Sequence, residues 1–379
     1  MDQDIVGGPF TRVEWKPFNL NSPDEVKKYL LEHGWEPENW NYKKSKNGFV
    51  EKDEQGNPIK TSPSMRGDPF NGVEGDIPKL VARRNVLMHR KRLLKNVRKT
   101  DDEETGLINL VREDGRVKAG AIPIATNTHR CRHNGIVNIP SVDAVYGHDI
   151  RSLFTVPEGY NLVGVDAAAL EARMQAHYVY PFKGGPELAD LLINGDIHQA
   201  NADMWGCTRK QAKSPYYCLM YGGQPPKLAM TMGCGLQDAK SYFNMFWDQY
   251  EPLTEFKNTI TSIWEDRGGK DGGYLKSIHG AKLFARSPHA LVNMMFQSAG
   301  SINVMYATVF LDKFINLHKL NAHQVIHMHD EFQVEVVDKD TDKLVELALM
   351  SFEKAGKYLK MNVPIIGEAK VGKTWADAH

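Results

Sequence analysis

The sequence predicts an α+β fold. Apolar and polar residues alternate in a strand-like pattern at 325–336, whereas residues 186–265 show helical spacing that glycine and proline interrupt. The strand-like and helix-like segments follow no regular β-α-β order, which would indicate a parallel sheet. A chain of 379 residues is long enough for two or three subdomains with a substantial core.

The composition is that of an ordinary globular protein, with 41% apolar and 25% charged residues. Lys plus Arg and Asp plus Glu both number 47, so the net charge gives no sign of nucleic-acid binding. No apolar run reaches membrane-spanning length and the acidic start is unlike a signal peptide, so we expect a cytoplasmic protein without membrane contact. The four cysteines lack a paired spacing, which predicts reduced thiols.

The first part of the chain shows few patterned segments. Ser22 and Pro23 are a typical cap and first residue of a helix. Residues 46–72 are rich in Gly, Pro and charge, which predicts a loop or linker with few strands. A basic helix without acidic residues is predicted at 79–99. It could follow a phosphate backbone or lie on a solvated surface, and the sequence leaves both open.

The later elements are predicted in this order: a hairpin turning at 114–115, a buried strand at 161–165, a helix at 290–318, the hairpin at 325–336 and a helix at 340–359. Asp166 stands between the strand at 161–165 and the helix that follows it. No internal repeat or low-complexity tract is present.

The hairpin "VIHMHDEFQVEV" carries three acid or imidazole groups at its turn. Asp330 could be an ordinary turn residue, or its carboxylate could project into a cleft and bind a divalent metal. His327 and His329 are two residues apart and share one strand face, so a hydrolytic zinc site is a third interpretation. That interpretation needs a third ligand from elsewhere in the chain.

Asp166 and Asp330 each end an apolar strand. If the two strands are neighbours in one antiparallel sheet, the carboxylates meet and repel unless cations lie between them. Two Mg²⁺ ions could relieve this repulsion and hold the attacking and leaving oxygens of a phosphoryl transfer. Two unrelated surface aspartates are the alternative.

Arg209, Lys213, Tyr217 and Tyr221 recur every four residues, so a helix would align them in one stripe. Aromatic stripes are usually core, but a core does not normally begin with two cations. Cations at one end and rings at the other suit a nucleoside triphosphate. Gly222 then ends the helix and allows another chain segment to approach closely.

Several ordered segments together resemble motifs of the family A DNA polymerases. They are "THRCRHNGIVNIP" at 128–140, "VDAAALEARMQAH" at 165–177, "GDIH" at 195–198, "RKQAKSPYYCLMYGG" at 209–223, "RSPHALVNMMFQSAG" at 286–300, "HDE" at 329–331 and the closing "GKTWADAH". The resemblance extends to bacterial DNA polymerase I and more strongly to the replicases of short-tailed phages. It covers nearly the whole chain and identifies the protein as a member of this family.

The resemblance implies a right-hand polymerase fold, with an antiparallel palm sheet, a helical fingers subdomain and only a partial thumb. It divides the chain into 1–75 (partial thumb and first palm segment), 76–185 (palm with the primer-contacting segment and first metal motif), 186–280 (fingers) and 281–379 (palm, second metal motif and tail). It implies DNA-directed DNA polymerase activity in phage replication, with primer-template DNA and dNTPs as partners.

In this resemblance Asp166, Asp330 and the carbonyl of Ala167 would hold two Mg²⁺ ions, for which Mn²⁺ can substitute. Glu331 would support them as a further catalytic carboxylate. Lys213 would bind the triphosphate and act as a general acid.

The resemblance also assigns contacts to the incoming nucleotide. Arg209 and His198 would bind the triphosphate together with Lys213. Tyr217 would lie near the sugar and permit dideoxynucleotides, and Tyr221 would stack at the templating position. Glu171 would exclude the ribose 2′-hydroxyl. The residues expected to contact DNA are Arg130, Asn293, Gln297, His329 and Gly222.

Three departures from the family pattern stand out. Pro215 should kink or restart the fingers helix. His129 replaces a glycine of the family's Thr-Gly-Arg segment, in which Arg130 lies. The exonuclease and most of the thumb are expected to be missing, which predicts a fragment or a split-polymerase subunit. A separate chain or processivity factor would then supply the rest, and this chain alone would be weakly active at moderate salt.

Three other functions are weighed against the polymerase. A single-subunit RNA polymerase shares the same plan, but Glu171 and Glu331 favour deoxynucleotides. A catalytically weak fragment could act mainly as a DNA-binding or partner-binding module. A zinc hydrolase leaves the stripe of Arg209, Lys213, Tyr217 and Tyr221 unexplained.

Overall fold

A computed structural model of the protein describes residues 16–45, 50–55, 58–65, 70–97 and 104–379. Two compact units divide the chain. The first contains the chain up to Glu51 together with Ile59–Arg92, and the second contains Lys52–Pro58 and Leu93–His379.

The first unit combines two helices with a small sheet. Helix α1 (Pro23–Glu32) begins as predicted, because the Ser22 side chain accepts a hydrogen bond from the Glu25 amide. Strand β1 (Asn39–Tyr42) pairs antiparallel with β2 (Lys60–Ser64), so the segment predicted to hold few strands does contain one. Pro63 is tolerated in β2 because that strand pairs on one side only.

The predicted basic helix is α2 (Asp76–Leu94), which ends earlier than the predicted 79–99, because Asn96–Val97 form a short strand and residues 98–99 lie outside the described residues. Its buried residues are Pro78, Val81 and Ala82, and the last two join Val26, Leu30 and Trp35 of the α1 region in a small core. Four of the six Lys and Arg residues of α2 are exposed to solvent. A basic face open to solvent is compatible with both interpretations of this helix.

The second unit is built on a four-stranded antiparallel sheet in the order β10-β11-β7-β12. Its strands are β7 (Tyr160–Ala167), β10 (Ala322–Met328), β11 (Glu331–Val337) and β12 (Gly367–Gly372). The predicted hairpin is formed by β10 and β11, and the predicted strand is β7. The edge strand β12 was not predicted, because its six residues begin and end with glycine, which is uncommon in strands, and its pairing with β7 defines it.

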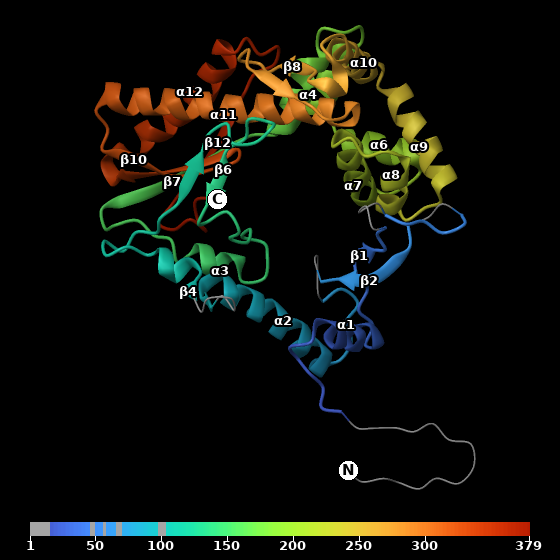
Figure 1. The fold of residues 1–379 in the computed structure, drawn as a ribbon. Helices are drawn as coiled ribbons and strands as arrows, with labels where there is room; N and C mark the ends of the chain where they lie inside the picture. Colours follow the sequence, from blue (N-terminus) through green and yellow to red (C-terminus); the bar gives the residue numbers. More distant parts are fainter. Residues whose placement is uncertain (1–15, 46–49, 56–57, 66–69, 98–103) are drawn as a thin grey trace, which may run out of the picture. The chain divides into compact units, whose positions relative to one another are not determined.

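Helices cover this sheet. Helix α12 (Thr341–Tyr358) packs on β7, β11 and β12, and α11 (Leu291–His318) packs beside α12 (Figure 1). The rings of Phe332 and Phe352 stack at 5.4 Å between sheet and helix. Both helices match the segments predicted for them. Mixed helices and an antiparallel sheet confirm the α+β class.

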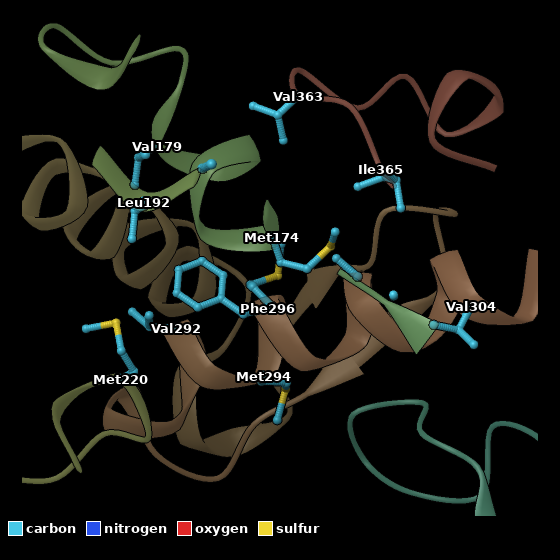
Figure 2. Packing of buried hydrophobic residues seen from close by; sticks show 14 of the residues in the cluster. Met174, Val179, Leu192, Met220, Val292, Met294, Phe296, Val304, Val363 and Ile365 are labelled. Atoms are coloured by element: carbon cyan, nitrogen blue, oxygen red, sulfur yellow. The ribbon is translucent and has the colours of Figure 1, made fainter. Parts of the chain in front are cut away.

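The helical middle of the chain begins with α4 (Leu170–Val179). It continues through α5 (Gly185–Ile193), α6 (Ile197–Trp205), α7 (Arg209–Met220), α8 (Pro225–Met232), α9 (Leu236–Gln249) and α10 (Glu251–Asp266). The breaks at Gly222, Pro225 and Gly233 fall where predicted. Phe296 of α11 lies among Met174, Val292 and other apolar side chains, so one core joins these helices to the sheet (Figure 2).

Pro215 was expected to kink or restart the fingers helix. The restart is wrong, because α7 runs through Pro215 as one helix, and the kink stays a prediction. The missing proline N–H removes one hydrogen bond, but two features offset this loss. Thr208 and Gln211 form a reciprocal capping box at the start of α7. Pro215 itself is buried among the neighbouring helices.

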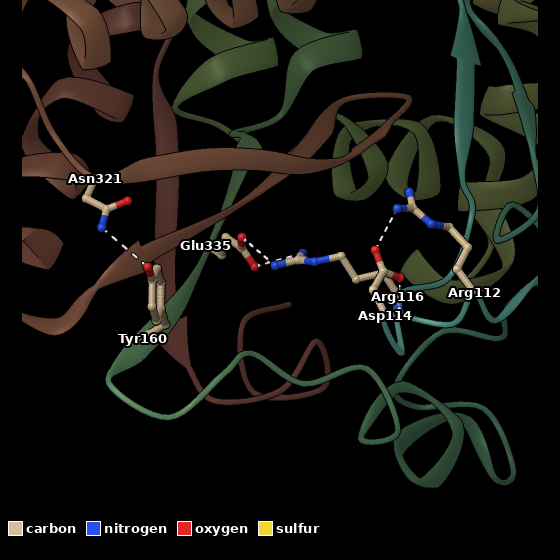
Figure 3. A network of polar contacts seen from close by, with 6 residues as sticks. All are labelled: Arg112, Asp114, Arg116, Tyr160, Asn321 and Glu335. Carbon is tan, nitrogen blue, oxygen red and sulfur yellow. Dashed lines mark hydrogen bonds and ion pairs between the residues drawn. The ribbon is translucent and has the colours of Figure 1, made fainter.

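The turn predicted at 114–115 closes a single bridge between Val111 and Val117, without extended strands on either side. Arg116, just after this turn, makes two hydrogen bonds of 2.9 and 3.1 Å to the buried Glu335 carboxylate of β11 (Figure 3). The Glu335 hydrogen bonds and charge raise the pKa of Arg116. This ion pair fastens the 112–117 loop to the sheet.

The remaining described elements are short. They are β3 (Asn96–Val97), β4 (Glu104–Thr105), η1 (Leu107–Leu110), β5 (Gly120–Ile122), β6 (Arg132–Asn134), α3 (Gly147–Arg151), η2 (Gly269–Asp271), β8 (Tyr274–Lys276), β9 (Lys282–Phe284), η3 (Pro288–Ala290) and η4 (Asp338–Asp340). Strand β5 pairs with β6, which lies within the segment 128–140 that was predicted to contact the primer.

Candidate active site

Three acidic residues meet at one corner of the sheet. Asp166 near the end of β7 lies directly opposite Glu331, the first residue of β11. The Ala167 amide donates a hydrogen bond of 3.1 Å to the carbonyl oxygen of Asp330. The strands that carry Asp166 and Asp330 are therefore neighbours, which was the condition for the two carboxylates to meet.

The charges at this corner are not balanced within the protein. Partial burial and the negative charges of Asp330 and Glu331 raise the pKa of Asp166 to about 7. Oxygen donors that repel one another are the set that hard divalent cations prefer. The residues present therefore fit Mg²⁺, and the carboxylates of Asp166 and Asp330 could serve as its ligands.

The raised pKa predicts how stability changes with pH when no metal is added. The folded protein holds the Asp166 proton more tightly than the unfolded chain, so its contribution to stability is lost as pH rises from about 4 to about 7. Asp166→Asn remains neutral throughout. We expect the melting temperature of Asp166→Asn to rise relative to that of wild type between about pH 4 and about pH 7. Above that interval the difference between the two melting temperatures should stay constant.

Thermal melts in chelator at several pH values check this expectation. Asp342→Asn, an exposed aspartate on α12, is the matched control and should follow wild type. A constant difference between Asp166→Asn and wild type from pH 4 to pH 8 would contradict the predicted coupling.

Glu331 is buried, with 5% of its surface exposed, and its carboxylate is held by the end of the chain. His379 Nδ1 lies 2.8 Å from Oε2, and Trp375 Nε1 donates to Oε1 at 3.0 Å. Gln333 donates a further hydrogen bond to the same carboxylate. Burial acts to raise the pKa of Glu331, but these hydrogen bonds outweigh it and lower that pKa. Glu331 is thus an ionised carboxylate at this corner, and the hydrogen bonds hold it in place.

Sequence reasoning missed these partners of Glu331. The visible signal was that Glu331, Gln333 and Glu335 occupy one face of β11. An alternating strand usually leaves its polar face open to solvent, yet all three residues are buried. A polar face that is fully buried needs polar partners, and the closing segment supplies them to Glu331 and Gln333.

His329 lies at the exposed tip of the hairpin with a positive φ of 58°. Burial of its ring and the charge of Arg130 lower the pKa of His329, although Asp330 opposes them. The charge of Arg130 also acts on Tyr221. Arg130 therefore lies within electrostatic reach of the hairpin tip and of the end of α7. Its amide is fixed by a 3.0 Å hydrogen bond to the Thr126 hydroxyl.

Helix α7 presents the predicted stripe on its surface. Arg209, Lys213 and Tyr221 are exposed and Tyr217 is half-buried, so the stripe does not belong to the core. The rings of Tyr217 and Tyr221 stack at 6.2 Å with an interplanar angle of 21°. The stripe offers cations at its first turns and an aromatic surface at its last.

Asp196 organises the cationic end of the stripe. Its side chain caps α6 by accepting hydrogen bonds from the amides of His198 and Gln199, and it forms a 2.6 Å ion pair with Arg209. The charges of Arg209 and Lys213 act on His198, which places the three side chains together. Asp196 was not predicted as a site residue. Its place two residues before His198 was the available signal.

Glu171 connects the stripe to the carboxylate corner. The Tyr221 hydroxyl donates a 2.7 Å hydrogen bond to Glu171, which lies in the first turn of α4. Helix α4 begins four residues after Asp166. This hydrogen bond joins the aromatic end of the α7 stripe to the segment that follows Asp166.

Gly222 has a φ of +79° at the end of α7, and a Cβ there would lie 1.9 Å from the His289 carbonyl oxygen. Gly222→Ala is expected to destabilise the protein by at least about 2 kcal/mol, since it adds a backbone clash to the strain of a positive φ. Gly233→Ala is the matched control, because Gly233 has a φ of +70° with open space around it. Equal losses of melting temperature in the two variants would contradict the predicted clash.

Asn293 and Gln297 lie on one face of α11, four residues apart and partly exposed between buried neighbours. Across the described chain, no hydrogen bond joins their side chains to each other. Both side chains are partly exposed to solvent on that face.

The fold and this site define a class of protein. The model of DNA polymerase family A matches residues 9–377, and the chain belongs to that family. The solved POL domain of Pol1 from M. smegmatis, in complex with DNA primer-template and dNTP, has the same fold, with a TM-score of 0.71. Sequence identity to it is 21%, over 96% of this chain and 62% of that one.

The relatives of this chain include phage enzymes that are named DNA-directed DNA polymerase. The enzyme of Escherichia phage Phieco32 is 29% identical over 82% of this chain and 61% of its own length. Those of Enterobacteria phage T3 and Escherichia phage T7 are each 25% identical over 99% of this chain and 54% of theirs. The chain thus spans about half to three fifths of the curated relatives it matches. No helix in the described residues is long and apolar enough to cross a membrane.

Proposed function

We propose that this chain is a DNA-directed DNA polymerase that adds deoxynucleotides to a primer 3′-hydroxyl, as in phage DNA replication. The observation that carries the proposal is the joining of two sites. Asp166, Asp330 and Glu331 form the carboxylate corner, and the Tyr221–Glu171 hydrogen bond connects it to the cationic and aromatic stripe of α7. Phage relatives support action in the cytoplasm of an infected cell.

Asp166 and Asp330, with the carbonyl of Ala167, would hold two Mg²⁺ ions, or Mn²⁺ in their place. Bound there, the metal supplies activation of the primer hydroxyl and charge stabilisation at the pyrophosphate. The buried Glu331 fixes the end of β11 and so orients the adjacent Asp330. The protein contributes the fixed oxygen ligands and the excess negative charge that favour cation binding.

Arg209, Lys213 and His198 would bind the triphosphate. Arg209 must give up its ion pair with Asp196 to do so. Because this ion pair is exposed to solvent, breaking it costs little free energy. Lys213 can donate a proton to the departing pyrophosphate. The ring of Tyr217 would lie against the sugar, and Tyr221 would stack at the templating position.

Primer and template would be held by groups that do not distinguish one base pair from another. Arg130 and His329 lie near the hairpin tip, and Asn293 and Gln297 share one face of α11. Amide and cationic donors of this kind can bind the acceptors of the minor groove, which are nearly the same for every base pair. Gly222 allows the end of α7 to approach the segment that leads into α11.

Glu171 would exclude ribonucleotides, because it crowds the position of a 2′-hydroxyl. Glu171→Ala is expected to lower the preference for dNTPs over rNTPs by roughly 10- to 100-fold, with a smaller change in dNTP incorporation. Single-nucleotide extension with dNTP and rNTP measures this ratio. Glu187→Ala, in the first turn of α5, is the control. An unchanged ratio in Glu171→Ala would remove Glu171 from this role.

Primer extension by the full chain with Mg²⁺ tests the proposed function. We expect addition of the nucleotide complementary to the template. Binding of primer-template DNA without extension would instead support a DNA-binding or partner-binding module. Preferential addition of rNTPs would support an RNA polymerase.

A further inference from the structure

Cys131, His133 and His327 form a cluster beside the carboxylate corner. One potential ligand atom from each lies within 4.8 Å of the other two. Cys131 immediately precedes β6 and His133 lies within it, so the two residues are two apart in extended chain and point to the same side. His327 lies in β10, opposite Phe332 of β11. The fold thus brings a C-x-H sequence against the H-x-H sequence of the hairpin.

The two imidazoles are arranged face to face. Nε2 of His133 lies 3.5 Å from Nδ1 of His327, and the rings stack at 5.8 Å with an angle of 17°. At 3.5 Å a proton shared between these nitrogens would give only a weak hydrogen bond. The facing nitrogens therefore lack a strong hydrogen bond to each other, and both could bind one metal ion instead.

A thiolate and two imidazoles are the ligands that zinc prefers, whereas Mg²⁺ prefers oxygen. Zinc–nitrogen bonds of about 2.0–2.1 Å in a tetrahedron place neighbouring nitrogens roughly 3.3 Å apart. The observed 3.5 Å between His133 and His327 is close to this value. Cys131 is buried, with 9% of its surface exposed, so a bound ion would be shielded from competing thiols.

We propose that Cys131, His133 and His327 bind one zinc-class divalent ion, which fastens the primer-contacting segment at β6 to the β10–β11 hairpin. The fourth position is open to water or to His329, whose ring lies 5.0 Å from that of His133. The site is separate from the oxygen ligands of the carboxylate corner. Cys131 and His133 are the further ligands that the sequence alone did not reveal for a zinc site at His327.

Cobalt titration of the full chain tests this proposal, because four-coordinate Co²⁺ absorbs visible light and a thiolate ligand adds a charge-transfer band. Metal-free protein is titrated in excess Mg²⁺, which occupies the carboxylate corner. We expect one Co²⁺ per chain, with the thiolate band, and displacement by Zn²⁺. Cys131→Ser should abolish that band and weaken binding at least 10-fold, and His133→Asn and His327→Gln should weaken it comparably.

Two control variants separate this cluster from other thiols and histidines. Cys207→Ser removes a half-buried thiol outside the cluster, and His323→Gln removes an exposed imidazole on the same strand as His327. Both should bind Co²⁺ as wild type does. A thiolate band that survives Cys131→Ser, or wild-type spectra that lack it, would overturn the proposal.

A second measurement needs no substitution in the cluster. Alkylation of wild-type protein, read by mass spectrometry at each cysteine, should become at least 10-fold slower at Cys131 when Zn²⁺ is added. Cys207, Cys218 and Cys234 serve as internal references and should keep their rates. Equal protection of all four thiols, or of none, would contradict zinc binding at Cys131. The result does not depend on polymerase activity, so its failure leaves the proposed function standing.

Discussion

Replacing Asp166 or Asp330 by Asn is expected to reduce nucleotide addition roughly 1,000-fold, while primer-template binding changes little. Each substitution keeps the shape of the side chain but removes one negative charge from the corner where β7 and β11 meet. Charge stabilisation by metal at such a site contributes several kcal/mol to catalysis, and each 1.36 kcal/mol corresponds to a tenfold change in rate. Single-turnover extension of a labelled primer at saturating dNTP measures the loss.

Asp342→Asn is the matched control for this experiment, because Asp342 is exposed on the first turn of α12. Its extension rate should equal that of wild type. A double variant of Asp166 and Asp330 should lose little more than either single variant, because the two carboxylates act as one unit. Substantial extension by Asp166→Asn at ordinary Mg²⁺ concentration would contradict the proposed role of the corner.

The carboxylate corner could be predicted from sequence for a local reason. Asp166 and Asp330 each end an apolar run with strand character, and antiparallel pairing brings such ends together. The α7 stripe was predictable because its spacing follows the helical repeat. In both cases the residues that carry the pattern belong to one helix or lie at the end of one strand, so the local sequence contains the signal.

Features that depend on contacts between distant segments were not predicted. Asp196 pairs with Arg209 across the boundary between two helices, and nothing in the spacing of either helix specifies that pair. Pro215 was expected to kink or restart α7, but α7 does not restart there, because the capping box and the burial of the helix outweigh the lost hydrogen bond. His327 had no role beyond that of a possible zinc ligand with His329, because its neighbours Cys131 and His133 come from a segment almost two hundred residues earlier.

The interaction of the closing segment with the sheet is the clearest case of this kind. Trp375 is fully buried, donates to Glu331 and lies under the guanidinium of Arg151 at 4.3 Å. Alanine at Gly164 would place a Cβ 1.7 Å from the Ala378 carbonyl oxygen, which shows how closely this segment approaches β7. The sequence alone marks Trp375 only as part of a family motif. Its contacts indicate that it holds a charged residue of the candidate site in place.

Trp375→Ala is expected to destabilise the second unit by about 3–5 kcal/mol, because it leaves a large cavity and removes a hydrogen bond from the buried Glu331 carboxylate. Trp375→Phe keeps most of the ring and loses only the N–H donor, so it should cost about 1.5–3 kcal/mol. Val371→Ala, at a side chain 46% exposed on β12, should stay within about 0.5 kcal/mol of wild type.

Hydrogen exchange of the β7 and β11 amides measures these differences in the sheet itself, because exchange of core strands reports the free energy of opening. These amides should be most protected from exchange in wild type and Val371→Ala, less protected in Trp375→Phe and least protected in Trp375→Ala. Primer extension should fall in the same order, since Glu331 adjoins Asp330 and a displaced Glu331 moves the metal ligand beside it. If Trp375→Phe exchanged like wild type, the hydrogen bond to Glu331 would contribute nothing and only ring packing would hold the closing segment.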